Sequence, residues 1–279
     1  MGAITNFAAL QAGLSGGVRS DTFMFYNGNV GIVVGGWLSS YARYTPGAVT
    51  PSLPETLNSA SPGNMISIPL TSTKQFWICE AEFAGYNATP NTRFNATLYD
   101  RLSHMGGLAT NIITEQTTNL PTAALTRYTN GEGVIPHVEV YGNMGTVATT
   151  ATIKYTNQAG VSGQISQPLL FTSNINNIND CITPFMLADG DTGCRSVESF
   201  TMAGTSATNA NVGITLLKKI CHLPCDTGSY VERQGYRQMM FHGGITEVLP
   251  GAYLQLLFVP SSSTSGVWNM SGRIGIIEA

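Results

Sequence analysis

Apolar and polar residues alternate along much of this chain with the period of two that is typical of half-buried β-strands. Gly, Pro and Asn residues that favour turns separate the alternating segments. The pattern predicts strands at Met65 to Leu70, Lys74 to Tyr86, Phe94 to Leu102, His137 to Tyr141, Ala151 to Tyr155, Leu169 to Thr172, Ser196 to Met202, Val212 to Leu217, Tyr253 to Val259 and Val267 to Ile277. In the segment from Ala151 to Tyr155, we expect Ala151, Ile153 and Tyr155 to share one face.

The first strands are predicted to form a hairpin. Phe23 to Tyr26 and Val30 to Val34 flank the sequence Asn27-Gly28-Asn29, and Asn-Gly accepts the positive φ of a tight turn. Helix signals are weak, and the best candidates are Asn6 to Leu14 and Ser229 to Phe241.

The spacing of short strands and turns predicts an all-β fold with little helix, namely an antiparallel β-sandwich or jelly roll. Residues 45–64 and 173–180 are expected to be polar loops. The Gly-rich and Pro-containing stretch 103–134 is interpreted as a linker or excursion. We therefore predict two β domains. The first covers residues 1–120 and includes a partner-contacting arm and loop, and the second covers residues 121–279.

Charge is scarce in this chain. Only 10% of the 279 residues are charged, the net charge is −3, and Gly occupies 31 positions. The 13 Lys and Arg residues are scattered, so no basic stripe for nucleic acid is expected. No apolar run is long enough for a membrane span, and no signal peptide is recognised at the start of the sequence. A surface of Ser, Thr, Asn and Gly favours a building block of a protein assembly.

The densest group of potential metal ligands is Cys221, His222 and Cys225. Three interpretations stay open: reduced structural cysteines, a disulfide between Cys221 and Cys225, or a zinc site, for which a fourth ligand is not evident. Asp189 and Asp191 could present carboxylates to Ca²⁺, but they lack the other ligands of a calcium loop, so a turn is favoured. We expect no cofactor.

Asp100, Arg101 and His104 could suggest acid–base chemistry. We interpret them instead as a structural ion pair at a corner or subunit contact, and hence as candidate interface residues. No nucleophile, phosphate-loop or metalloprotease motif is recognised, and the few acidic residues are mostly single. We therefore expect that the protein is not an enzyme.

Three runs of residues carry a resemblance to a known family. They are Leu125 to Val134 (LTRYTNGEGV), Tyr155 to Gly163 (YTNQAGVSG) and Leu187 to Phe200 (LADGDTGCRSVESF), and the segment Pro250 to Phe258 (PGAYLQLLF) is similar too. In order and spacing, they resemble a family of structural proteins encoded by tailed bacteriophages. The match is good over roughly the last 160 residues and loose over the N-terminal third. Cys194 and the pair Cys221 and Cys225 depart from the family pattern.

The resemblance implies a virion component made in the bacterial host cytoplasm. We expect a capsid decoration or cement protein that stabilises the head, forms a homotrimer, and contacts the major capsid protein or other virion proteins. The alternative is a collar, tail or fibre component involved in attachment or host-surface binding. No nucleic-acid or membrane partner is expected.

Overall fold

The computed structural model describes residues 7–16, 19–31, 38–39, 53–64, 66, 68–87, 94–121, 124–171, 181–225, 232–234, 246–260 and 265–278. It is built almost entirely from antiparallel β-strands, which confirms the predicted all-β class with little helix. The one helix in the described residues is α1 (Phe7–Ser15), which coincides with the predicted N-terminal helix. No helix among the described residues has the length and apolar character needed to cross a membrane.

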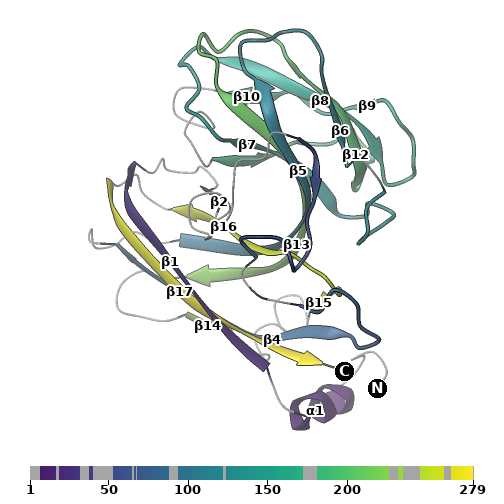
Figure 1. The fold of residues 1–279 in the computed structure, drawn as a ribbon, viewed down its shortest axis with the longest axis vertical. Helices are drawn as coiled ribbons and strands as arrows, with labels where there is room; N and C mark the ends of the chain where they lie inside the picture. The colour runs from purple at the N-terminus through teal and green to yellow at the C-terminus, as the bar shows by residue number, and fades with distance from the viewer. Residues whose placement is uncertain are drawn as a thin grey trace.

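The strands form three sheets, which are arranged from top to bottom in Figure 1. The upper sheet has the strand order β10-β8-β12-β6, with β9 also paired to β8. Its strands are β6 (Gln116–Leu120), β8 (Thr149–Asn157), β9 (Gln164–Ile165), β10 (Leu169–Phe171) and β12 (Cys194–Met202). In β8, Ala151, Ile153 and Tyr155 are buried while the intervening residues are only partly buried, as predicted.

The central sheet has the order β11-β7-β13-β5-β16-β2, with β3 paired to β5. Its strands are β2 (Leu38–Ser39), β3 (Glu55–Thr56), β5 (Phe94–Ala109), β7 (Val134–Val140), β11 (Ile182–Pro184), β13 (Asn211–Cys225) and β16 (Leu254–Pro260). The lower sheet has the order β1-β17-β4-β14, with β15 paired to β4. Its strands are β1 (Arg19–Gly31), β4 (Phe76–Asn87), β14 (Glu232–Gln234), β15 (Thr246–Val248) and β17 (Ser265–Glu278).

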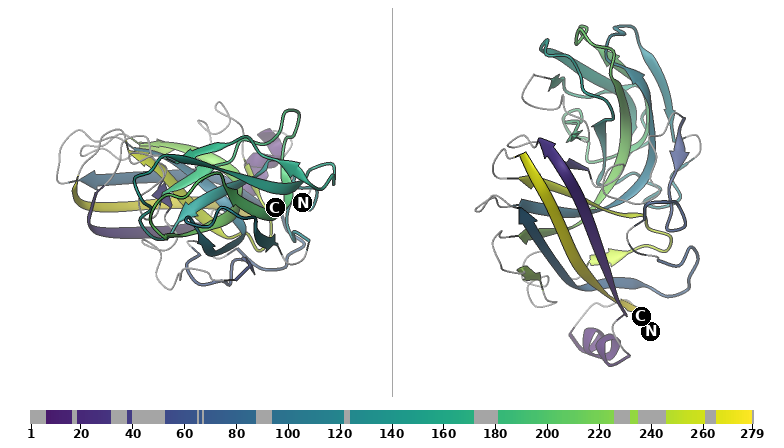
Figure 2. Two further views of the ribbon diagram at one scale, coloured as in Figure 1. Left: turned by 90° about the horizontal axis from the view of Figure 1, so that it is seen from above. Right: turned by 60° about the vertical axis from the view of Figure 1, so that its left-hand side comes forward.

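One hydrophobic core joins the three sheets. Ile276 of β17, Leu256 of β16, Ile214 of β13 and Phe200 of β12 all belong to the same buried cluster. The views in Figure 2 show the lower sheet ending beside α1 and the upper sheet at the opposite end of the molecule. Strands from both sides of the predicted boundary at residue 120 pair within each sheet. The boundary between residues 1–120 and 121–279 therefore does not separate the sheets.

Several local predictions are corrected by the structure. The expected turn at Asn27-Gly28-Asn29 is instead part of one continuous strand, β1, which ends at Gly31, and Asn27-Gly28 lies at an irregularity in its pairing with β17. The end of the predicted hairpin, residues 32–34, lies outside the described residues. Pairing to a distant strand has replaced the local turn. Within the predicted linker 103–134, β5 continues to Ala109 and β6 follows.

In the predicted second helix, Glu232–Gln234 is a strand. The described residues of the predicted strand at 65–70 lie outside any strand. The predicted loop at 173–180 lies outside the described residues, as does the first part of the 45–64 loop.

Candidate functional site

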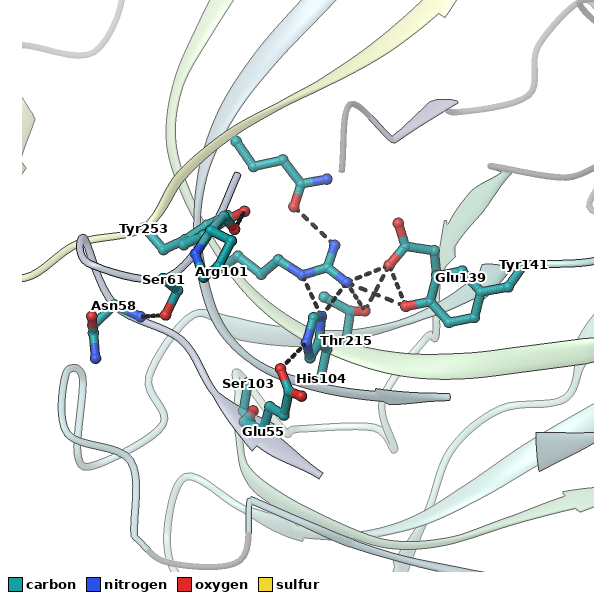
Figure 3. Close-up of polar contacts among 12 residues, drawn as sticks. Glu55, Asn58, Ser61, Arg101, Ser103, His104, Glu139, Tyr141, Thr215 and Tyr253 are labelled. Atoms are coloured by element: carbon teal, nitrogen blue, oxygen red, sulfur yellow. Dashed lines mark hydrogen bonds and ion pairs between the residues drawn. The ribbon is translucent and has the colours of Figure 1, made fainter. Parts of the chain in front are cut away.

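A buried polar network centred on Arg101 lies on the central sheet, and Figure 3 shows its members. The Arg101 side chain is fully buried. Its Nη2 donates to Glu139 Oε2 at 2.6 Å, and its Nη1 donates to Gln255 Oε1 at 3.0 Å. Thr215 Oγ1 lies 3.2 Å from the same Nη2. One guanidinium therefore connects β5, β7, β13 and β16.

His104 lies on the other side of this guanidinium. Arg101 Nε donates to His104 Nδ1 at 3.0 Å, and Nη2 lies 2.7 Å from the same nitrogen. Since a guanidinium can only donate, Nδ1 must accept, and the ring proton resides on Nε2. That Nε2 lies 3.2 Å from Glu55 Oε2 and donates to it. Burial, together with the Arg101 charge, holds the pKa of His104 well below its usual value, so the ring is neutral.

An irregularity in β5 puts Arg101 and His104 on one side of the strand. The pairing of β5 with β13 shifts between Arg101 and Ser103, leaving Leu102 as an extra residue. Regular alternation would place residues three apart on opposite faces. The bulge removes that offset and allows both side chains to meet.

The Glu139 carboxylate is held by several donors. Its Oε2 accepts from Tyr141 Oη at 2.9 Å and from Thr215 Oγ1 at 3.0 Å, in addition to Arg101. Burial, followed by the nearby Glu139 charge, raises the pKa of Tyr141 well above its usual value, so the phenol keeps its proton and donates. The network is thus built from complementary donors and acceptors in a protected environment.

A second buried ion pair lies next to the first along β5. Arg127 Nε and Nη2 each donate to Asp100 at 2.8 Å, in a bidentate arrangement. The Tyr253 N–H also donates to Asp100 Oδ1 at 3.0 Å, and Arg127 Nη2 donates to Leu57 O at 3.0 Å. Burial raises the pKa of Asp100, whereas Arg127 acts in the opposite direction. This pair ties the 53–64 segment and the 124–131 segment to the central sheet.

These contacts correct the expectation for Asp100, Arg101 and His104. The expected ion pair between Asp100 and Arg101 is replaced by two pairs, one with Arg127 and one with Glu139. All three side chains have no exposed surface, so they cannot provide a contact surface for another protein in this conformation. The two ion pairs join separate segments of one chain, so their role is structural.

Sequence reasoning missed most of the network, namely Glu55, Arg127, Glu139, Tyr141, Thr215 and Gln255. One usable signal was present. Glu139 stands between Val138 and Val140 in an apolar strand, and a charge in such a setting needs a buried partner. The identity of that partner depends on strand register, which the sequence does not reveal.

The cysteine-rich candidate site lies entirely within β13. Cys221 is a free thiol, and burial raises its pKa to about 12, with Lys219 opposing. An extended strand separates Cys221 from Cys225 by roughly 13 Å over four residues, which exceeds the roughly 7 Å Cα limit of a disulfide. His222 Nδ1 instead lies 3.1 Å from Thr97 Oγ1. The side chain of Cys225 lies outside the described residues, and no group of three potential ligands for a metal occurs within them.

The two candidate calcium ligands occupy a turn. Asp191 accepts from Tyr155 Oη at 2.5 Å and from Asn157 Nδ2 at 2.7 Å. Its N–H donates to Ala188 O at 3.0 Å, and Gly190 has a φ of 89°. The Asp191 carboxylate is therefore already engaged with donors of the chain, whereas Asp189 is exposed. This geometry matches the turn interpretation.

The three sequence runs that carry the resemblance meet at one cluster of loops. Gly133 N donates to Thr192 O at 3.0 Å, and Gln158 N donates to Gly193 O at 3.1 Å. Arg195 Nη2 donates to Gln158 O at 2.6 Å. Residues that are far apart in sequence thus form one closely bonded end of the upper and central sheets.

Comparison with known proteins finds no matching family model and no matching curated relative. Among solved structures, the chain is similar to that of the infectious bursal disease virus Gt strain, with 10% identity over 94% of this chain and 80% of the other, at a TM-score of 0.22. It is also similar to the VP2 subviral particle of infectious bursal disease virus, with 10% identity, the same coverage of both chains and a TM-score of 0.21. Likenesses at this level carry no functional argument, so function is argued from the chain itself.

Proposed function

We propose that this protein is a structural component of a tailed-phage virion, most specifically a capsid decoration protein that reinforces the head through protein–protein contacts. The main support for the proposal is that several of the few charged residues are buried in ion pairs within the chain. In a chain with only 10% charged residues, Asp100, Arg101, Arg127 and Glu139 form two buried ion pairs. The charges that this chain has are used in part to hold the scaffold together.

The remaining surface suits contacts with other proteins. The partly buried face of β8 presents Thr150, Thr152 and Thr156, and its one charged residue, Lys154, pairs with Glu198 of β12 at 4.0 Å. Neutral polar side chains cost less to desolvate than charged ones when a contact forms. A net charge of −3 also disfavours association with packaged DNA.

The resemblance of the three sequence runs to tailed-phage structural proteins gives the proposal its specific form. On this proposal the protein resides in the phage particle, forms a homotrimer, and contacts the major capsid protein. It acts by binding rather than by catalysis, and it needs no cofactor.

The test is antibody labelling of intact particles of the parent phage, viewed by electron microscopy. Uniform label over the head supports the decoration role. Label confined to the neck, tail or fibre tips overturns it in favour of an attachment component. Absence of label, with the antibody shown to bind the purified protein and disrupted particles free of the protein by mass spectrometry, overturns the virion role altogether.

A further inference from the structure

Three loops meet at one end of the upper and central sheets. Residues 110–115 connect β5 to β6, residues 141–148 connect β7 to β8, and residues 203–210 connect β12 to β13. We call these three segments together the loop tip. Thr110 N donates to Ala210 O at 3.3 Å, and the ideal Cβ position of Gly145 lies 1.7 Å from Ser206 O. The 203–210 loop therefore contacts both of the others.

Hydrogen bonds at Thr110 join the 110–115 and 203–210 loops of the loop tip. Thr110 and Ser206 are fully buried at its centre. Thr110 Oγ1 donates to Thr208 O at 2.8 Å, and Ser206 Oγ donates to Thr110 Oγ1 at 2.9 Å. Ala210 N donates to Thr110 Oγ1 at 3.1 Å. Loops fixed in this way lose little conformational entropy when they bind.

The surface of the loop tip carries three large exposed apolar side chains and almost no charge. Ile112, Ile113 and Val147 are 42%, 58% and 50% exposed. The other exposed residues of the loop tip are Asn, Thr and Ala, apart from Glu115. Glu115 is the one charged residue of the three loops, and its Oε1 accepts from Ser199 Oγ at 2.5 Å. Exposed apolar side chains among neutral polar ones, with little charge, are typical of a protein interface.

We infer that the loop tip is a self-association surface that binds the loop tip of a second copy of this chain. Charge complementarity favours this occupant. A charged partner surface would lose its hydration against the loop tip and find no counter-charge there except Glu115. A second copy presents the same surface, whose one charge is Glu115, so copies can meet there around the symmetry axis of the proposed homotrimer without strong repulsion.

The loop tip would be the surface through which copies of the chain associate, and this inference rests on the homotrimer of the proposed function. Its test uses the purified full chain alone and does not involve the phage particle. The two proposals can therefore fail independently, because a protein on the head can be monomeric in solution and a protein absent from the particle can self-associate through the loop tip.

The experiment measures the self-association constant by sedimentation equilibrium for the wild type and for the double variant Ile112→Ser, Ile113→Ser. Removing two apolar side chains from the contact should raise the dissociation constant by about tenfold or more. Val147→Ser tests the surface from a second loop and should weaken association in the same direction. The matched control is Leu53→Ser with Leu70→Ser, two residues that are 71% and 53% exposed and lie outside the loop tip.

The control should associate as the wild type does, and circular dichroism should show that each variant is folded. A wild type that stays monomeric at high concentration overturns the inference. So does association that survives both the double variant and Val147→Ser, or a control that weakens association as much as they do. If the double variant fails to fold, the Val147→Ser result decides.

Discussion

His137 should make the fold sensitive to mild acid. The ring is 3% exposed on β7, and its Nδ1–H donates to Ile135 O at 2.9 Å. The Tyr99 ring contacts it edge-on, with centroids 5.9 Å apart. Burial lowers the pKa of His137 to about 4, although the hydrogen bond to Ile135 and the Glu139 charge oppose it; the Arg101 charge adds a smaller effect in the same direction as burial. The folded protein therefore holds this ring neutral.

The sign and size of the effect follow from linkage. In the unfolded chain, the pKa of a histidine is near 6.5, so the unfolded state gains a proton below that pH while the folded state does not. The stabilisation that comes from keeping His137 neutral is fully present above pH 6.5 and is lost as the pH falls toward 4. With these two pKa values, His137 alone should lower the free energy of unfolding by about 2 kcal/mol between pH 7 and pH 5.

The assay is urea unfolding at both pH values, followed by the fluorescence of the three tryptophans. The variant His137→Phe keeps a ring against Tyr99 and removes the titrating group, so its pH-dependent loss should be smaller than that of the wild type by about 2 kcal/mol. His222→Phe is the control, because that residue is exposed, and it should keep most of the wild-type loss. Equal pH dependence in His137→Phe and the wild type would refute the reasoning.

Further predictions concern the buried charges, the loop glycines and the thiols. Arg127→Met leaves the Asp100 carboxylate buried without its ion partner and should lower the free energy of unfolding, measured in urea, by about 3–5 kcal/mol. Adding Asp100→Asn should recover part of that loss. If the losses of the two single variants simply add in the double variant, the coupling is contradicted. Gly193→Ala would put a Cβ 2.0 Å from Gly131 O, whereas Gly190→Ala meets no atom within 4 Å. The first should therefore lower the melting temperature clearly more than the second, and equal shifts would contradict the close packing. All five cysteines should react with a thiol reagent in denaturant without reductant; a count of three would establish a disulfide.

The sequence pattern predicted the strands that depend on local alternation, and it failed where distant pairing decides. The alternation of Ala151, Ile153 and Tyr155 correctly gave the buried face of β8, because the burial of one face determines the side-chain period. Asn27-Gly28 has the local chemistry of a turn, yet it continues β1 because β17 pairs with both sides of it. A local turn signal says nothing of whether a long partner strand is present.

The candidate site was predicted only in part for a related reason. Asp100, Arg101 and His104 lie within five consecutive residues, and they do lie in one polar region. Their partners, however, come from other strands and segments, as Glu139 of β7 and Arg127 illustrate. Which residues meet across a sheet is determined by register, and register emerges only when all the strands are assembled.

The order of charges along β5 gives the two ion pairs a further role in that assembly. Asp100 and Arg101 are neighbours with opposite charges, and their partners Arg127 and Glu139 also have opposite charges. Because a slip of one residue turns each side chain of a strand to the other face, such a slip would bring either Asp100 toward Glu139 or Arg101 toward Arg127, depending on its direction. Like charges would then be buried together, which is strongly unfavourable. The two pairs therefore select the register of a strand of 16 residues at the centre of the central sheet. In a chain with so few charged residues, this placement stabilises one arrangement of the sheets, while the loop tip carries only one charged residue, Glu115.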